Sequence, residues 1–210
     1  MRLYDYAASG NCFKVRLLLG LLGRPYERVP VDIFAGDTLT DAYFAINPLR
    51  ETPVLELDSG ERIAQSSAIL WYLGEGTPLL PSDPLERALV VQWLSFEQER
   101  IMGGLGNPRF RLLTGRPAPD LDARLATGRG ALALLDAHLA ERDWLVGERV
   151  TIADVGAFPY VSVAGDAGVA LSEYPGVVAW LDRVRGLGGF VDDFVTYPSN
   201  ARPGAGRSIY

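Results

Sequence analysis

Cysteine and histidine are almost missing from this chain, which has one of each in 210 residues. Cys12 has no partner for an intrachain disulfide, so a disulfide framework is excluded and a reducing compartment is expected. Cys12 and His138 lie far apart in the sequence, which leaves no cysteine and histidine cluster for a metal ion. We therefore expect no metal site.

Long apolar runs and an excess of basic residues are also missing. No apolar run approaches about 18 residues, the length that suggests a membrane-spanning helix. Residues 1–6 contain no apolar core of a secretion signal. The formal net charge of −6 disfavours nucleic acid and anionic membranes as partners. We expect a soluble, cytoplasmic protein.

The composition that remains is that of a globular protein, with 48% hydrophobic and 22% charged residues. Its length suits two compact domains. Residues 74–84 are rich in glycine and proline and separate two halves with different patterns. We place the first domain at residues 1–76, a linker at 77–84 and the second domain at 85–210.

The first domain has the predicted element order βαβαββα. Strands are expected at residues 3–6 and 26–31, with a helix at 11–22 between them. A weak helix, a hairpin and a last helix follow, at residues 39–45, 53–57 with 62–64, and 67–73. This order predicts a mixed four-stranded sheet covered by helices, which is the thioredoxin-like arrangement.

The second domain is predicted to be all-α. Apolar residues recur at helical spacing within residues 85–96, 121–139 and 177–184. Residues 103–119 are rich in glycine and proline, so we expect a loop there between two long helices. From residue 196 onward we expect an irregular tail that could lie across the surface.

Two short motifs carry more specific information. Thr151 and Asp154 have the spacing of a capping box, whose loss typically costs about 0.5–2 kcal/mol. At Thr52-Pro53, X-Pro is the bond at which a cis peptide costs least, about 0.5–1 kcal/mol, and a cis bond would turn the Thr52 backbone outward. Ser66 can cap the next helix, whose N–H groups attract a carboxylate. An open strand edge beside such a helix end suits a small acidic peptide.

Residues 9–16, 47–55 and 65–73 and the Thr151 capping box resemble, in order and spacing, the cytosolic glutathione transferases. The resemblance covers the chain nearly end to end, and the serine near the first helix resembles that of the theta, delta and zeta groups and related bacterial enzymes. It implies a thioredoxin-like glutathione-binding domain followed by an all-helical bundle. It also implies glutathione as a substrate, a small-molecule electrophile as the second substrate, and a homodimer.

Such an enzyme must offer a thiolate near neutral pH. Lowering a thiol pKa by two units requires about 2.7 kcal/mol of preference for the anion. One hydrogen bond to a charged acceptor contributes about 1.5–3 kcal/mol, and a helix N-terminus about 0.3–1 kcal/mol. The resemblance assigns this role to Ser9, although position alone favours a simple helix cap. Asn11 is the next candidate donor.

Other candidates are weaker by the same reasoning. Tyr4 and Tyr6 lie in the first strand, where other branches of the family have an active tyrosine, but packing is the stronger interpretation. Cys12 could form a mixed disulfide with glutathione, yet a lone cysteine on an apolar helix is more often buried and inert. His138 is expected to be structural.

The resemblance implies that Thr52, beside Pro53, pairs with the cysteinyl backbone, and that Gln65 and Ser66 bind the γ-glutamyl group. Gln65 stands where relatives often have an acid. At the glycine end, relatives often have basic or amide residues where this chain has Glu51 and Thr38. Arg50 could supply the missing positive charge, because a guanidinium binds a carboxylate in a bidentate manner. A solvated arginine is the alternative, and modest glutathione affinity is expected.

The electrophile is expected to lie against the helices that follow the linker. Arg109 and Arg111 beside Phe110 favour an anionic electrophile, although such clusters are usually solvated. The candidate walls of this pocket are Phe13, Trp93, Phe96, Arg100, Arg109 and Phe110.

The leading hypothesis is conjugation of glutathione to a small hydrophobic electrophile. Alternatives on the same site are a glutathione-dependent isomerase, lyase, dehalogenase, peroxidase or thiol-exchange enzyme. A zeta-type isomerase usually has a second serine and a cysteine beside the first serine, and residues 9–12 lack that doublet. A non-catalytic scaffold is the alternative from another class. Glu51 and Gln65 favour it, whereas the retained Ser9 argues against it.

Overall fold

The computed structural model describes residues 1–208, which form two compact units. The first unit contains residues 1–73 together with the tail that begins at Val191, and the second contains residues 74–190. The first unit is α+β and the second is all-helical. The predicted fold class is confirmed.

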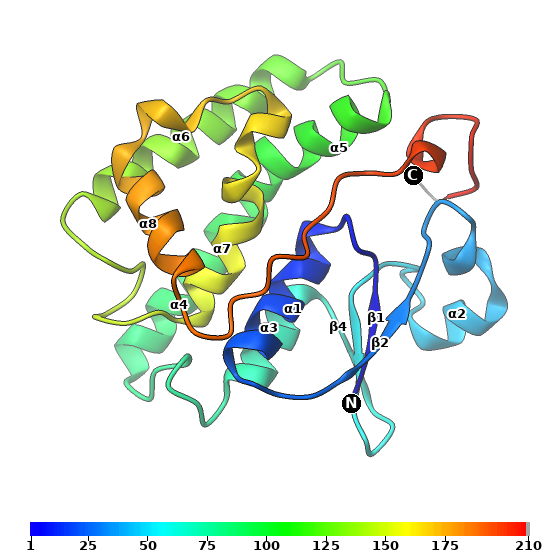
Figure 1. Cartoon of the computed structure of the whole chain (residues 1–210), viewed down its shortest axis with the longest axis horizontal. Coiled ribbons are helices and arrows are strands. Elements are labelled where there is room, and N and C mark those ends of the chain that lie inside the picture. Colours follow the sequence, from blue (N-terminus) through cyan, green and yellow to red (C-terminus); the bar gives the residue numbers. More distant parts are fainter. Residues whose placement is uncertain (209–210) are drawn as a thin grey trace. The chain divides into compact units, whose positions relative to one another are not determined.

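The first unit is built on a mixed four-stranded sheet with the order β2-β1-β3-β4 (Figure 1). Strand β1 (Arg2–Asp5) pairs in parallel with β2 (Glu27–Pro30) and antiparallel with β3 (Val54–Glu56). Strand β4 (Arg62–Ala64) continues the sheet antiparallel to β3. This parallel start and antiparallel finish is the thioredoxin-like topology that the sequence predicts.

Helices α1 (Gly10–Leu21), α2 (Asp41–Ile46) and α3 (Ser66–Gly74) complete the first unit, each close to its predicted position. A short 3₁₀ turn, η1 (Asp37–Leu39), precedes α2 and was not expected from the sequence. Strands β1 and β3 and helices α1 and α3 contribute side chains without exposed surface to the core, among them Leu3, Val54, Leu18 and Ile69.

The second unit contains five α-helices among the described residues, α4 (Pro84–Phe96), α5 (Asn107–Thr114), α6 (Leu121–Leu139), α7 (Ile152–Ser162) and α8 (Pro175–Arg185). The short turns η3 (Ala164–Ala167) and η4 (Leu171–Glu173) connect α7 to α8. No helix within residues 1–208 combines the length and apolar character needed to cross a membrane.

The loop predicted at residues 103–119 is wrong for residues 103–114, which are helical, whereas residues 115–119 are non-helical as expected. A π-helical segment, η2 (Glu97–Gly106), continues from α4 and leads directly into α5. The glycines here permit close packing: a Cβ on Gly104 would lie 2.4 Å from the backbone nitrogen of Gly128, and one on Gly106 would lie 2.9 Å from the Tyr160 ring. The helix ends only at Gly115, which has φ +72°.

The capping box at the start of α7 is present, and its carboxylate also serves the core. Asp154 Oδ2 accepts a hydrogen bond from the Thr151 N–H at 2.9 Å. Its Oδ1 accepts from the Leu145 N–H and from the Trp180 indole N–H, both at 3.0 Å. Burial raises the pKa of Asp154. These donors compensate a carboxylate that has lost all contact with water.

The tail from Val191 packs on the first unit, where it follows α1 and ends beside the loop after β2 (Figure 1). Its only helical turn among the described residues is η5 (Ser199–Ala201). The ring of Phe194 stacks on that of Phe13 with centroids 4.9 Å apart. The Arg207 N–H donates to the Phe34 carbonyl oxygen at 2.6 Å. The tail is therefore an integral layer of this unit.

A ring of four charged side chains fastens the tail. Arg16 donates to Asp5 at 2.5 Å and to Asp193 at 2.8 Å. Arg28 donates to the same two carboxylates, at 2.5 Å and 3.2 Å. Arg16 and Asp5 have almost no exposed surface, and buried charges are tolerated only when they are fully paired. Asp193 thus ties the tail directly to α1 and β2, whose two arginines also hold Asp5 of β1.

We predict that Asp193→Asn loosens the tail. Loss of the charged contact should cost about 1 kcal/mol, which makes the detached state roughly fivefold more populated. Cleavage by chymotrypsin after Phe194 should accelerate by that factor, because proteolysis follows the open population. Asp192→Asn removes the same charge from an exposed neighbour and should leave the cleavage rate unchanged. Equal rates in the two variants would contradict the prediction.

Candidate active site

The first turn of α1 carries the predicted thiolate donors. Ser9 is the N-cap of this helix, and its Oγ accepts a hydrogen bond from the Cys12 N–H at 3.3 Å. A hydroxyl that accepts through its oxygen can still donate its own hydrogen. The cap function and a role toward a ligand are therefore compatible in the same residue.

A small polar hollow lies beside this turn, with a volume of about 30 Å³. That volume is close to the space of one water molecule. Six of the seven residues around it are sequence candidates, and Asn47 is the one that sequence reasoning missed. The lining residues are Asn11, Asn47, Glu51, Thr52, Pro53, Gln65 and Ser66.

Asn47 shapes the loop that leads into Thr52. Its Nδ2 donates to the Glu51 carbonyl oxygen at 2.9 Å, and the Tyr43 hydroxyl donates to the same oxygen at 2.9 Å. The Thr52–Pro53 peptide bond is cis, as expected. Within residues 1–208, neither the N–H nor the C=O of Thr52 has a hydrogen-bond partner. This backbone is available to an extended ligand.

Gln65 occupies the turn between β4 and α3 with φ +70°. Left-handed backbone is uncommon for a residue other than glycine, and such outliers cluster at ligand sites. Its Nε2 donates to Glu51 Oε2 at 3.4 Å, so Glu51 faces Gln65 across the hollow. Ser66 begins α3 and is buried, and its Oγ donates to Asn11 Oδ1 at 3.5 Å.

Arg50 and Thr38 do not line the hollow. The Arg50 guanidinium donates to the carbonyl oxygens of Thr38, at 2.8 Å, and Thr40, at 3.2 Å. It also lies 5.0 Å from the centre of the Phe44 ring. Thr38 is 1% exposed. Arg50 thus stabilises the segment before α2 through these hydrogen bonds.

Cys12 lies against the same turn but is fully buried. Its Sγ accepts a hydrogen bond from the Tyr6 N–H at 3.3 Å. Burial, reinforced by the negative charge of Asp5, raises the pKa of the thiol to about 12, even though the side chains of Thr52 and Ser9 hydrogen-bond to it. The thiol is therefore neutral at physiological pH.

We predict that Cys12 resists alkylation in the folded protein. A rise from the ordinary value of 9.0 to about 12 leaves roughly a thousandfold less thiolate at any pH below both values. At about pH 8, iodoacetamide should modify the chain slowly when it is native and rapidly once denaturant has returned the thiol to its ordinary pKa. Mass spectrometry gives both rates. Native labelling at the rate of an exposed thiol would contradict the prediction.

The candidate wall residues for an electrophile fall in different surroundings. Phe13 belongs to the first unit and stacks on Phe194. Trp93 is buried, with its ring 5.3 Å from Phe96 and 4.9 Å from His138.

The wall candidates Arg109 and Phe110, and the arginines near them, contact neighbours within the helical unit. Arg109 is buried, and its Nε donates to Asp166 at 2.9 Å. The guanidinium of Arg116 lies over the Phe110 ring at 5.0 Å. Arg111 donates to the Pro117 carbonyl oxygen at 2.9 Å.

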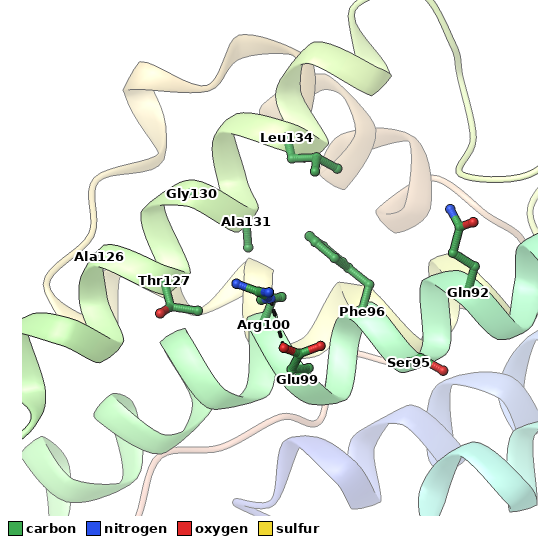
Figure 2. Close-up of a pocket in the computed structure, with 10 residues that line it drawn as sticks. All are labelled: Gln92, Ser95, Phe96, Glu99, Arg100, Ala126, Thr127, Gly130, Ala131 and Leu134. Atoms are coloured by element: carbon green, nitrogen blue, oxygen red, sulfur yellow. Dashed lines mark ion pairs between the residues drawn. The ribbon is translucent and has the colours of Figure 1, made fainter.

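Two wall candidates share a cavity within the helical unit. Phe96 and Arg100 point into a space of about 820 Å³ between α4, η2 and α6 (Figure 2). Leu134 and Ala131 face them from α6, and Arg100 forms an ion pair with Glu99 at 3.2 Å (Figure 2). His138 lies on the same helix, and its Nε2 is 3.1 Å from the Leu145 carbonyl oxygen. Burial lowers the pKa of His138, which fits the expected structural role.

No group of three or more His, Cys, Asp or Glu side chains within residues 1–208 is arranged to hold a metal ion. The hollow itself has one ionisable lining residue, Glu51. Its chemistry is that of hydrogen-bond donors and backbone groups.

Comparison with known proteins gives consistent matches over most of the chain. Residues 8–75 match the model for the N-terminal domain of glutathione S-transferase, and residues 93–187 match that for its C-terminal domain. A crystal structure of glutathione S-transferase from Pseudomonas fluorescens has a TM-score of 0.88 and 39% identity, covering 92% of this chain and 98% of that chain.

Two relatives carry names other than glutathione S-transferase. Maleylacetoacetate isomerase of Rhizobium meliloti is 34% identical over 220 residues, which cover 96% of this chain and 97% of the relative. Disulfide-bond oxidoreductase YfcG of Escherichia coli is 30% identical over 193 residues, covering 86% and 88%. With the domain matches and the shared fold, these similarities show that the chain belongs to the glutathione S-transferase family of glutathione-dependent enzymes.

Proposed function

We propose that this protein conjugates glutathione to small hydrophobic electrophiles. In this reaction the glutathione thiolate attacks an electrophilic carbon, a carbon–sulfur bond forms, and the leaving group departs with its electron pair. The observation that carries the proposal is the set of groups that line one hollow: the Asn11 amide in the first turn of α1, the unpaired Thr52 backbone, and Ser66 at the start of α3. Ser9, the N-cap of α1, is not itself a lining residue of this hollow. A peptide that carries a thiolate needs such groups to bind its backbone and its charged ends.

The hollow is too small to enclose a tripeptide, so glutathione would lie across it. Its cysteinyl backbone would pair with the N–H and C=O of Thr52, as an added strand does. Its γ-glutamyl carboxylate would meet the Ser66 hydroxyl and the free N–H groups at the start of α3. Glu51 faces Gln65 and would accept from the γ-glutamyl ammonium. Glu51 would thus take the role of the acidic side chain that relatives often have at the position of Gln65.

The sulfur would lie at the first turn of α1, where Ser9 and Asn11 can donate. One hydrogen bond to an anion contributes about 1.5–3 kcal/mol, and the helix end adds about 0.3–1 kcal/mol. Together they match the roughly 2.7 kcal/mol that a two-unit fall in thiol pKa requires. No general base is needed.

Isomerisation is the second candidate function, because the Rhizobium meliloti relative is a maleylacetoacetate isomerase. Reversible addition of the same thiolate to a double bond would use the same donors. A disulfide-exchange role, suggested by the name of the Escherichia coli relative, would have to use the glutathione thiol, since the high pKa of Cys12 disfavours its own attack. A scaffold would not need the donors around the hollow.

We also propose a homodimer and a cytoplasmic location, as the family resemblance implies. Sedimentation equilibrium tests the first: twice the chain mass of 22.9 kDa is expected, and a monomer at micromolar concentration would contradict it.

The decisive test of the thiolate site is Ser9→Ala. We expect the variant to retain binding to immobilised glutathione, because Thr52 and Ser66 are untouched. Conjugation of an aryl halide at about pH 6.5 should fall by at least tenfold, since losing one donor to the anion costs about 1.5–3 kcal/mol.

Three outcomes would change the proposal. Full activity of Ser9→Ala would move the sulfur contact to Asn11 or a tyrosine. A wild-type protein that does not bind glutathione would favour the scaffold. Activity on a cis-configured dienone in the absence of conjugation would favour the isomerase.

A further inference from the structure

Lys14 is the only lysine among the 20 basic residues of the chain, and the rest are arginines. It lies one turn after Asn11 on α1 and has no exposed surface. A lysine is almost never fully buried unless it is paired, because an ammonium without partners in the interior is costly. Its Nζ donates to Asn11 Oδ1 at 2.8 Å.

This contact decides which way the Asn11 amide faces. An ammonium has only donors, so the atom that it approaches must be the amide oxygen. The Ser66 hydroxyl donates to the same oxygen at 3.5 Å. With the oxygen engaged on both sides, the amide NH₂ is the part that remains for a ligand. Within residues 1–208 this NH₂ makes no hydrogen bond, and Asn11 lines the hollow.

Without Lys14 the amide would keep only the contact with the Ser66 hydroxyl, at 3.5 Å, and a hydroxyl can accept from an NH₂ as well as donate to an oxygen. An asparagine side chain has an oxygen and a nitrogen of nearly the same shape, and rotation by half a turn would present the oxygen to the hollow. A carbonyl oxygen would repel a sulfur anion, and Glu51 already supplies negative charge there. A donor held in one orientation is therefore required if Asn11 is to favour the thiolate.

We propose that Lys14 is a positioning residue that fixes the Asn11 amide so that its NH₂ donates to the glutathione thiolate. The proposal rests on the proposed function, and it assigns to the buried lysine an effect on the sulfur that is transmitted through Asn11. Lys14 itself does not touch the substrate in this arrangement. Its compact ammonium fits this task better than a guanidinium, which has five donors to satisfy.

The test compares Lys14→Met, Lys14→Arg, Asn11→Ala and the double variant Lys14→Met/Asn11→Ala with the wild type. The thiol pKa of bound glutathione is read from thiolate ultraviolet absorbance against pH. Lys14→Met should raise this pKa by about one unit, which lowers the rate about tenfold at about pH 6.5 and restores it above both pKa values. KM for glutathione should change little, because the backbone contacts remain.

The other variants separate positioning from general support of the fold. Lys14→Arg keeps a donor-only group and should retain most of the activity. The double variant should have the thiol pKa of Asn11→Ala alone, because a residue that acts only through Asn11 adds nothing once Asn11 is removed. A wild-type thiol pKa in Lys14→Met, or full additivity in the double variant, would overturn the proposal.

A second measurement covers a Lys14→Met chain that fails to fold. Because the chain has one lysine, isotope-labelled lysine gives a single side-chain resonance in the wild type and in Asn11→Ala. That resonance should shift between the two proteins, with or without glutathione, and an unchanged resonance would overturn the Lys14–Asn11 contact. Failure of the wild type to bind glutathione would overturn the proposed function and this inference together, whereas the variant results bear on the inference alone.

Discussion

The constraint on which the rest of this structure depends is that each charge removed from water must find its partner inside the protein. Arg16 on α1 and Asp5 on β1 have almost no exposed surface, and their opposite charges pair with each other. Asp154 is held by backbone and indole donors in the helical unit. Because an unpaired buried charge is so costly, each of these groups fixes the elements around it.

Under the proposed function, the same constraint holds the donors of the candidate site in place. In the first turn of α1, Ser9 caps the helix, Cys12 is buried as a neutral thiol and Lys14 orients Asn11. Under the proposed function, the six residues from Ser9 to Lys14 therefore serve both packing and catalysis. A substitution that only disturbs packing there would still move the donors. Separating the two effects requires measurements on the bound sulfur and on stability in parallel.

Much of the fold and of the hollow could be predicted from the sequence, because both depend on local signals. These local signals each involve only a few residues. They are the changes between strand-like and helical spacing of the apolar residues, the Thr52-Pro53 pair and the Thr151 capping box. The errors concern contacts between distant residues. The helix through η2 and α5 was missed because Gly104 packs against Gly128, which the sequence does not reveal. Asn47 seemed only to end a helix, since its bond to the Glu51 carbonyl depends on the path of the loop.

The tail has a consequence for how the protein is made. The first unit is discontinuous: it opens the chain, is interrupted by residues 74–190, and is completed by the segment from Val191. During synthesis, Asp193 and Phe194 are translated only after the helical unit. The contacts of Arg16 with Asp193 and of Phe13 with Phe194 can therefore form only then. On the ribosome, the helices therefore have the opportunity to fold before the unit that contains the sheet is complete.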